Sequence, residues 1–132
     1  MQENLTVLVV DDDASVCDFV AILLQEEGYH AHCVGSAEQA SAFLRKGEIP
    51  VALLLTDIEL PGRNGIELMQ ECRDRDPSLP IVLMSGNPLR WLKEMKDVPF
   101  IMKPLSIHAF RKIIKAQIGK PHQGKKYETG TP

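Results

Sequence analysis

Acidic side chains follow two of the apolar runs in this 132-residue chain. The run Asp11–Asp13 comes directly after Leu5–Val10, and Asp57 comes shortly after Val51–Leu55. Carboxylates held close together repel each other and stay ionised only with a cation nearby. Oxygen ligands favour a hard ion, and a few protein ligands completed by water suit Mg²⁺ better than Ca²⁺. A carboxylate can also act as a nucleophile toward phosphorus.

Two further apolar runs end in groups that bind anions. Ser85 follows Ile81–Met84, and Lys103 follows Pro99–Met102. Phosphoryl transfer depends mainly on positioning and on neutralisation of charge. A divalent cation on one side and the Lys103 ammonium on the other would stabilise that charge, and the Ser85 hydroxyl can donate a hydrogen bond. These groups together predict a pocket suited to phosphoryl transfer onto a carboxylate.

The elements that must position these groups are visible in the hydrophobic pattern. The four apolar runs lack polar alternation, which is typical of parallel strands buried on both faces, and His30–Val34 predicts a weaker, more exposed strand. Helical patterns alternate with the strands and predict an α/β fold built from βαβ units. Ligands of such sheets bind outside the carboxyl ends of the strands, where the polar groups fall. The predicted helices cover residues 16–24 with a stop at Gly28, residues 37–46 between Ser36 and Gly47, residues 66–72, and residues 107–118 after Ser106.

The segment Asn87–Val98 carries the weakest helical pattern. Asn87-Pro88 resists entry into a helix, and the segment is short. We expect a short or irregular helix here. Trp91 within it is either a core residue or an exposed anchor for a partner.

Length and charge restrict the class of protein. The chain has the size of one domain, and we expect that domain to span residues 1–119, with residues 120–132 forming a polar tail or the start of a linker. The net charge of -3 does not suit a nucleic-acid binder. No apolar run approaches the ~18 residues that span a bilayer, and the N-terminus lacks a signal-peptide pattern. We therefore expect a cytoplasmic protein that does not bind membranes.

The cysteines and two of the histidines have plainer interpretations. The three cysteines lack CxxC spacing, and their odd number in an apparently cytosolic chain predicts free thiols used for packing. His30 and His32 can share one strand face, but two histidines without a third ligand are a weak metal signal.

The ordered set of strand-end residues resembles the response-regulator receiver domain of two-component signal transduction. The resemblance covers roughly residues 4–118, and Leu60–Gly65 resembles the family's loop between third strand and third helix, where Gly65 would allow a tight turn. It implies a flavodoxin-like (βα)5 fold, a doubly wound five-stranded parallel sheet with strand order 2-1-3-4-5. The fourth helix would be short or irregular, about one turn shorter than is usual in the family.

The resemblance also implies a role for each acidic residue. Asp57 would accept a phosphoryl group from a phosphohistidine on a sensor kinase. Asp12 and Asp57 would bind Mg²⁺ directly, Asp11 would bind it directly or through water, and the backbone carbonyl of Glu59 would complete the protein ligands.

The remaining positions would bind and report the phosphoryl group. Ser85 and Lys103 would bind its oxygens. Ser85 and Phe100 would form the switch, in which the new charge on Asp57 shifts a surface between two conformations. Phe100 lacks the hydroxyl of the commoner tyrosine, so a hydrogen-bonded latch is excluded at that residue. We hypothesise that the charge of Glu59 alters dephosphorylation.

The resemblance indicates partners as well. The donor would be a sensor histidine kinase or a histidine phosphotransfer protein, and the signal would pass to an output domain or a downstream protein. A phosphorylation-dependent dimer is compatible with the family, whereas direct nucleic-acid binding by this domain is not expected. Phosphoryl acceptance and autodephosphorylation at Asp57 would be autocatalytic, without turnover of a small molecule.

Two other functions stay open at this point. A pseudo-receiver would bind a partner without being phosphorylated, although all five key positions are filled. A small-molecule phosphatase with an aspartate nucleophile would place an acid two residues later, where this chain has Glu59, but we find no cap domain to enclose a substrate.

Overall fold

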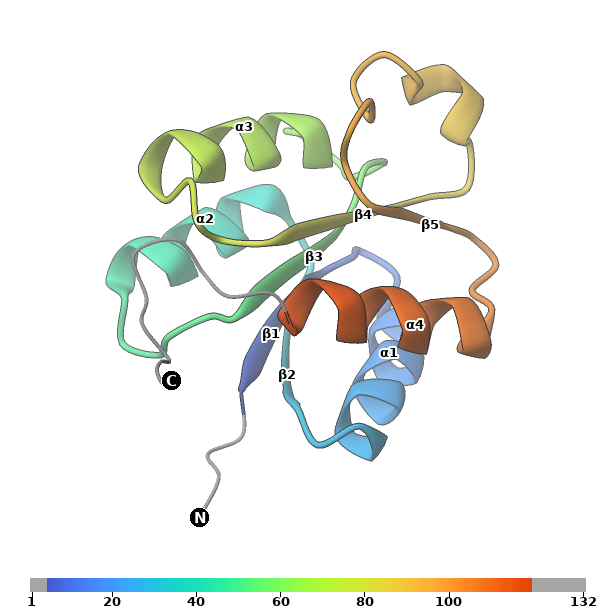
Figure 1. Ribbon diagram of the computed structural model, residues 1–132. Helices are drawn as coiled ribbons and strands as arrows, with labels where there is room; N and C mark the ends of the chain where they lie inside the picture. Colours follow the sequence, from blue (N-terminus) through green and yellow to red (C-terminus); the bar gives the residue numbers. More distant parts are fainter. Residues whose placement is uncertain (1–4, 120–132) are drawn as a thin grey trace.

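The computed structural model describes residues 5–119. Within this range, five strands form one parallel sheet in the order β2-β1-β3-β4-β5 (Figure 1). The predicted sheet and strand order are therefore confirmed. The chain leaves β1 toward β2 on one side and later returns to β3 on the other, so the strand order reverses next to β1. The strands are β1 Thr6–Val10, β2 His30–Val34, β3 Leu53–Asp57, β4 Ile81–Ser85 and β5 Phe100–Met102.

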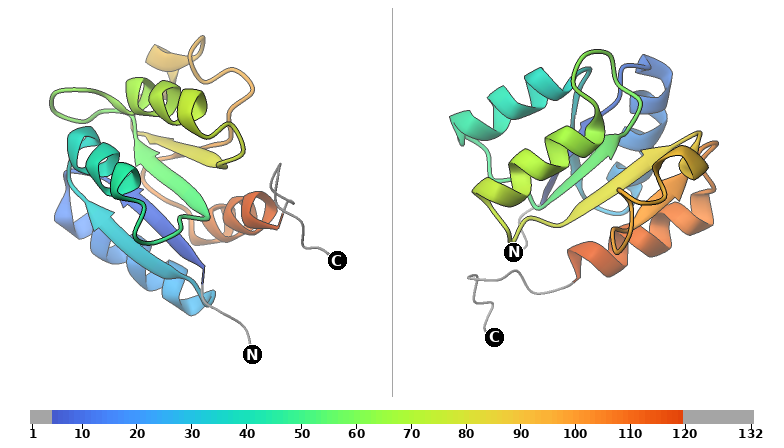
Figure 2. Two further views of the ribbon diagram at one scale, coloured as in Figure 1. Left: turned by 90° about the vertical axis from the view of Figure 1, so that its left-hand side faces the viewer. Right: turned by 90° about the horizontal axis from the view of Figure 1, so that it is seen from above.

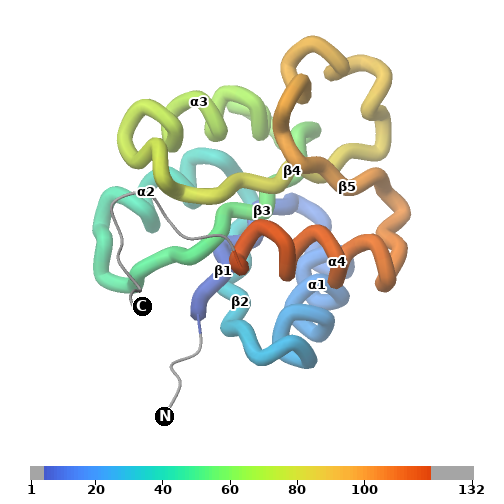
Figure 3. The backbone as a smooth tube through the Cα atoms, in the orientation of Figure 1, coloured from blue at the N-terminus to red at the C-terminus, as the bar shows by residue number. Residues whose placement is uncertain are grey.

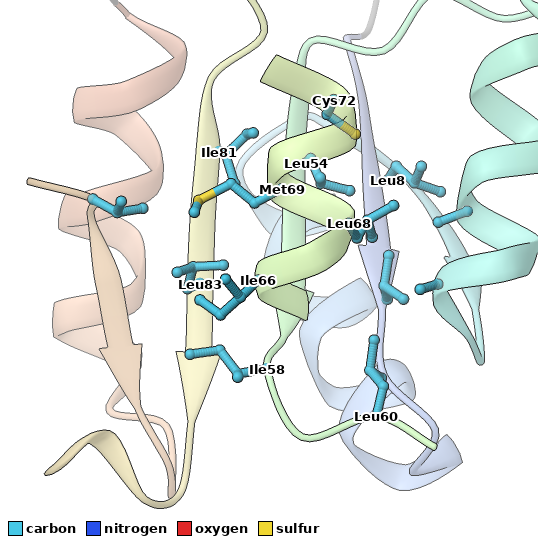
Figure 4. Close-up of a cluster of buried hydrophobic side chains, with 14 of the residues drawn as sticks. Leu8, Leu54, Ile58, Leu60, Ile66, Leu68, Met69, Cys72, Ile81 and Leu83 are labelled. Atoms are coloured by element: carbon cyan, nitrogen blue, oxygen red, sulfur yellow. The ribbon is translucent and has the colours of Figure 1, made fainter. Parts of the chain in front are cut away.

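Helices cover both faces of the sheet, as the unalternated apolar runs predicted (Figure 2). Successive side chains of a strand point to opposite faces. Leu8 accordingly joins the hydrophobic cluster under α2 and α3, part of which is drawn in Figure 4, whereas Val7 and Val9 join the cluster under α1 and α4. The helices are α1 Ala14–Glu26, α2 Ala37–Lys46, α3 Gly65–Arg75 and α4 Ile107–Ile118.

Local capping signals set the helix ends. The side chains of Ser36 and Ser106 accept hydrogen bonds from the backbone N–H groups of the first turns of α2 and α4, as predicted. Asp13 caps α1 in the same way, so the third carboxylate of the acidic run serves the helix. α2 ends at Gly47, whose φ of 66° is the left-handed conformation that glycine favours. α1 ends at Glu26, slightly before the predicted stop at Gly28.

The segment between β4 and β5 is irregular, which confirms the expected short helix. It contains a single 3₁₀ turn, η1 Pro88–Trp91, followed by hydrogen-bonded turns (Figure 3). Met95 and Val98 are buried in the α2–α3 cluster and anchor the second half of the segment. Leu89 and Leu92 are exposed.

The structure also bears on the predictions for the cysteines, for membrane spans and for the histidines of β2. The three cysteines are free thiols, as predicted. No helix within the described part of the chain is long and apolar enough to cross a membrane. His32 stacks on Phe43 of α2, with ring centroids 4.1 Å apart. The predicted tail at residues 120–132 lies outside the described residues, and the predicted domain boundary stays untested.

Candidate functional site

Four strands deliver their polar residues to one edge of the sheet. Asp11 follows β1, Asp57 is the last residue of β3, Ser85 is the last residue of β4, and Lys103 follows β5. The parallel register aligns these ends, because Asp57 lies beside Met84 of β4 and thus one position from Ser85. β3 begins and ends two residues later than the run Val51–Leu55, so Asp57 belongs to the strand itself.

The backbone of Asp57 is fixed by a close contact with the start of α3. The N–H of Gly65 donates to the carbonyl of Ile58 at 2.9 Å. A Cβ atom at position 65 would overlap the main-chain carbonyl of Asp57. Glycine is therefore needed at 65 because two backbones meet, whereas the positive φ of this loop, 73°, belongs to Gly62. The sequence correctly marked Gly65 but for a different physical reason.

Lys103 links the carboxylates of two strands. Its ammonium lies 2.7 Å from Oδ2 of Asp11 and 2.9 Å from Oδ2 of Asp57. Both carboxylates are almost fully buried, with 2% and 4% of the residue exposed. Burial would lower the pKa of Lys103, but its hydrogen bonds to Asp11 and Asp57 raise it, so the lysine is charged at neutral pH. Burial raises the pKa of Asp57 to about 6, and the nearby charge of Asp11 adds to this rise.

Three carboxylates converge in this pocket. One oxygen each of Asp11, Asp12 and Asp57 lies within 4.8 Å of the others, and residues 5–119 contain no other group of three such metal-binding side chains. One ammonium cannot neutralise three carboxylates. The oxygen-only ligands and the surplus negative charge fit a hard divalent cation. The ligand atoms that the sequence predicted from Asp11, Asp12 and Asp57 are thus brought together.

The Ser85 hydroxyl is directed to Glu59. It donates to Oε2 of Glu59 at 2.8 Å and accepts from the N–H of Asn87 at 2.9 Å. The indole N–H of Trp91 donates to the same Oε2 atom at 2.6 Å. Burial would raise the pKa of Glu59, but the hydrogen bonds from Ser85 and Trp91 lower it, so this carboxylate is ionised at neutral pH.

The contacts of Glu59 include one that the sequence did not indicate. Its N–H donates to Oδ1 of Asp57 at 3.2 Å, so the Glu59 backbone does lie beside the acceptor carboxylate. The metal-binding role of its carbonyl stays a prediction. The bond with Trp91 was missed, because nothing in a spacing of 32 residues indicates it.

Phe100 lies on the exposed side of β5. The residue is 40% exposed and, with Met102 and Ile113, lines a cavity of about 470 Å³ between β5 and α4. Its predicted role in the switch stays a prediction.

Fold and pocket together define a class of protein, and comparison with known proteins agrees. Residues 7–115 match the family described as the response regulator receiver domain. The chain belongs to this family, the receiver domains of two-component signalling.

The chain is also similar to individual proteins of known sequence or structure. It is 45% identical over 84 residues to the transcriptional regulatory protein AruR of Pseudomonas aeruginosa, covering 61% of this chain and 34% of AruR. It is 32% identical over 127 residues to the transcriptional regulatory protein FixJ of Azorhizobium caulinodans, covering 91% of this chain and 58% of FixJ. The chain thus spans only about a third to three fifths of these curated relatives. In fold it resembles a crystal structure of a putative response regulator from Chloroflexus aurantiacus, with a TM-score of 0.81 at 23% identity, covering 89% of this chain and all of that one.

Proposed function

We propose that this receiver domain is a phosphorylatable switch in which Asp57 accepts the phosphoryl group. The observation that carries the proposal is the buried Asp57 carboxylate, hydrogen-bonded to Lys103 and grouped with Asp11 and Asp12. A nucleophile, a cationic side chain and a set of acidic ligands are the parts that phosphoryl transfer requires.

The reaction follows from these positions. An oxygen of Asp57 attacks the phosphorus of a phosphohistidine on the kinase, a P–O bond forms, and the P–N bond breaks. The leaving imidazole nitrogen takes up a proton, and Asp57 becomes an acyl phosphate. Lys103, already 2.9 Å from Asp57, stabilises the charge on the phosphoryl oxygens. The Ser85 hydroxyl supplies a further hydrogen bond once it leaves Glu59.

Mg²⁺ is the cofactor that the acidic group fits best. Asp11, Asp12 and Asp57 would hold it, with the Glu59 carbonyl and water completing the ligands. When bound, the ion neutralises charge on the attacking carboxylate and on the transferred phosphoryl group. Ionisation of Asp57, which burial disfavours, also becomes easier beside a cation.

The partners follow from the same chemistry. The donor is a sensor histidine kinase or histidine phosphotransfer protein in the cytoplasm. AruR and FixJ are named as transcriptional regulators, which supports a signal passed to an output domain or to a separate downstream protein. Rotation of Phe100, and dimerisation through the altered surface, are the proposed responses to phosphorylation.

The test is labelling with acetyl phosphate, followed by intact mass. Wild type should gain one phosphoryl group in Mg²⁺ and none in EDTA, and Asp57→Asn should gain none in either. Asp74→Asn, which removes an exposed carboxylate on α3, is the matched control and should label like wild type.

Each alternative predicts a different result. A folded wild-type protein that never forms an adduct, with either acetyl phosphate or beryllofluoride, would be a pseudo-receiver with a constitutive partner. Continued turnover of a phosphomonoester, instead of stoichiometric labelling, would indicate the phosphatase.

A further inference from the structure

A chain of hydrogen bonds joins the acceptor loop to the irregular segment between β4 and β5. One carboxylate oxygen of Glu59 accepts from Ser85 at 2.8 Å and from Trp91 at 2.6 Å. Glu59 lies two residues after Asp57, and its N–H is bonded to the Asp57 carboxylate. Three elements therefore meet at a single oxygen beside the acceptor.

The Ser85 hydroxyl cannot serve two acceptors at once. A serine hydroxyl has one proton to donate, and in this structure Glu59 receives it. A hydrogen bond from Ser85 to a phosphoryl group on Asp57 therefore requires that Ser85 leave Glu59. The phosphoryl group brings about -1.5 to -2 charges, which also repel the Glu59 carboxylate.

Trp91 connects Glu59 to the irregular segment between β4 and β5. The backbone hydrogen bonds of residues 88–98 that the structure describes all stay within residues 87–98. Among residues 5–119, the bond from Trp91 to Glu59 is the one side-chain hydrogen bond that connects residues 88–98 to the rest of the domain. Leu89 and Leu92 on either side of Trp91 are exposed, so the partial packing of Trp91 is the main further contact of the first half of the segment with the core. Figure 1 shows the segment, in gold, projecting beyond the sheet.

We propose that Glu59 and Trp91 are positioning residues that hold the Ser85 hydroxyl away from Asp57, and that phosphorylation of Asp57 releases Trp91 and residues 88–92 with it. This inference rests on the proposed function. It assigns Trp91 a role as donor to Glu59, beyond its partial packing against the core. Phosphorylation and the position of Trp91 are then coupled in both directions.

The test uses the full 132-residue chain with Mg²⁺ and beryllofluoride, a stable mimic of the phosphoryl group. Trp91 is the only tryptophan, so one indole ¹H–¹⁵N resonance and the tryptophan emission both report on it. In wild type, the indole resonance should move on addition of beryllofluoride, toward its position in unliganded Glu59→Ala. In Glu59→Ala itself it should move far less.

Affinity measured by calorimetry supplies the second readout. Loss of the competing charged hydrogen bond should tighten beryllofluoride binding about tenfold in Glu59→Ala. Trp91→Phe keeps the Glu59 charge and an aromatic ring but removes the indole donor, so its tighter binding would show the contribution of the hydrogen bond from Trp91 to Glu59. Glu94→Gln removes an exposed carboxylate of the same segment and should bind like wild type.

The outcomes separate this inference from the proposed function. If beryllofluoride binds but the wild-type indole resonance stays in place, or Trp91→Phe binds no tighter, the positioning role is refuted and the phosphoacceptor stands. If tightening occurs in Glu59→Ala alone, Glu59 acts through its charge and Trp91 has no part. If no variant binds beryllofluoride, both proposals fail.

Discussion

Replacing Asp57 by asparagine should stabilise the fold at neutral pH when no divalent cation is present. The pKa of Asp57 is raised from 3.8 to about 6, chiefly by burial. The folded state therefore holds the proton more tightly than the unfolded state, and ionisation costs stability. A shift of about 2 units at 1.36 kcal/mol per unit amounts to about 3 kcal/mol. Asparagine is similar in size and avoids this cost.

The upward shift of the Asp57 pKa on folding determines how the stability difference depends on pH. Below pH about 4 the carboxyl is protonated in both states, and the two proteins should be about equally stable. Between pH 4 and 6 the wild type loses stability relative to Asp57→Asn, and above pH 6 the full difference is present. Urea unfolding in EDTA at pH 4, 5, 6 and 7.5 measures this curve. Asp74→Asn, on the exposed face of α3, controls for the loss of one negative charge.

Two results would contradict the reasoning. If Asp57→Asn is less stable than wild type at pH 7.5, the ion pair with Lys103 outweighs the cost of burial. If the difference exists but does not vary with pH, its origin is packing and not ionisation.

Further predictions concern the same pocket. Mg²⁺ at a hundredfold excess over its Kd should raise the free energy of unfolding of wild type by about 2.7 kcal/mol, seen as a higher urea midpoint. The increase should be smaller for Asp57→Asn, and equal increases would mean that the ion binds elsewhere. Gly65→Ala should cost roughly 1–3 kcal/mol and slow acetyl phosphate labelling, because the new methyl group overlaps the Asp57 carbonyl. Gly35→Ala, whose Cβ would make an ordinary contact at 3.6 Å, is its control, and full-rate labelling of Gly65→Ala would refute the argument. Lys103→Met should lower the free energy of unfolding by about 3–5 kcal/mol in EDTA, because it leaves two buried carboxylates without their cation. Mg²⁺ should restore part of this loss, and urea denaturation with and without Mg²⁺ measures both effects. An unchanged urea midpoint in EDTA would contradict the prediction.

Much of the fold could be predicted because its signals are local. Buried parallel strands must be continuously apolar, helices must be capped, and glycine favours the left-handed stop, as at Gly47. Ser36 and Ser106 cap helices by hydrogen bonds that span three residues. Strand ends were less certain, because β3 extends to Asp57 only through pairing with its neighbours.

The pocket was predictable in composition and not in its bonds. Parallel strands in a fixed order bring their carboxyl ends together, so the sequence alone indicated that Asp11, Asp57, Ser85 and Lys103 meet. Which oxygen each donor selects depends on rotamers and packing between segments far apart in sequence. The tertiary structure therefore decided that Lys103 links two carboxylates, and that one oxygen of Glu59 holds both Ser85 and Trp91.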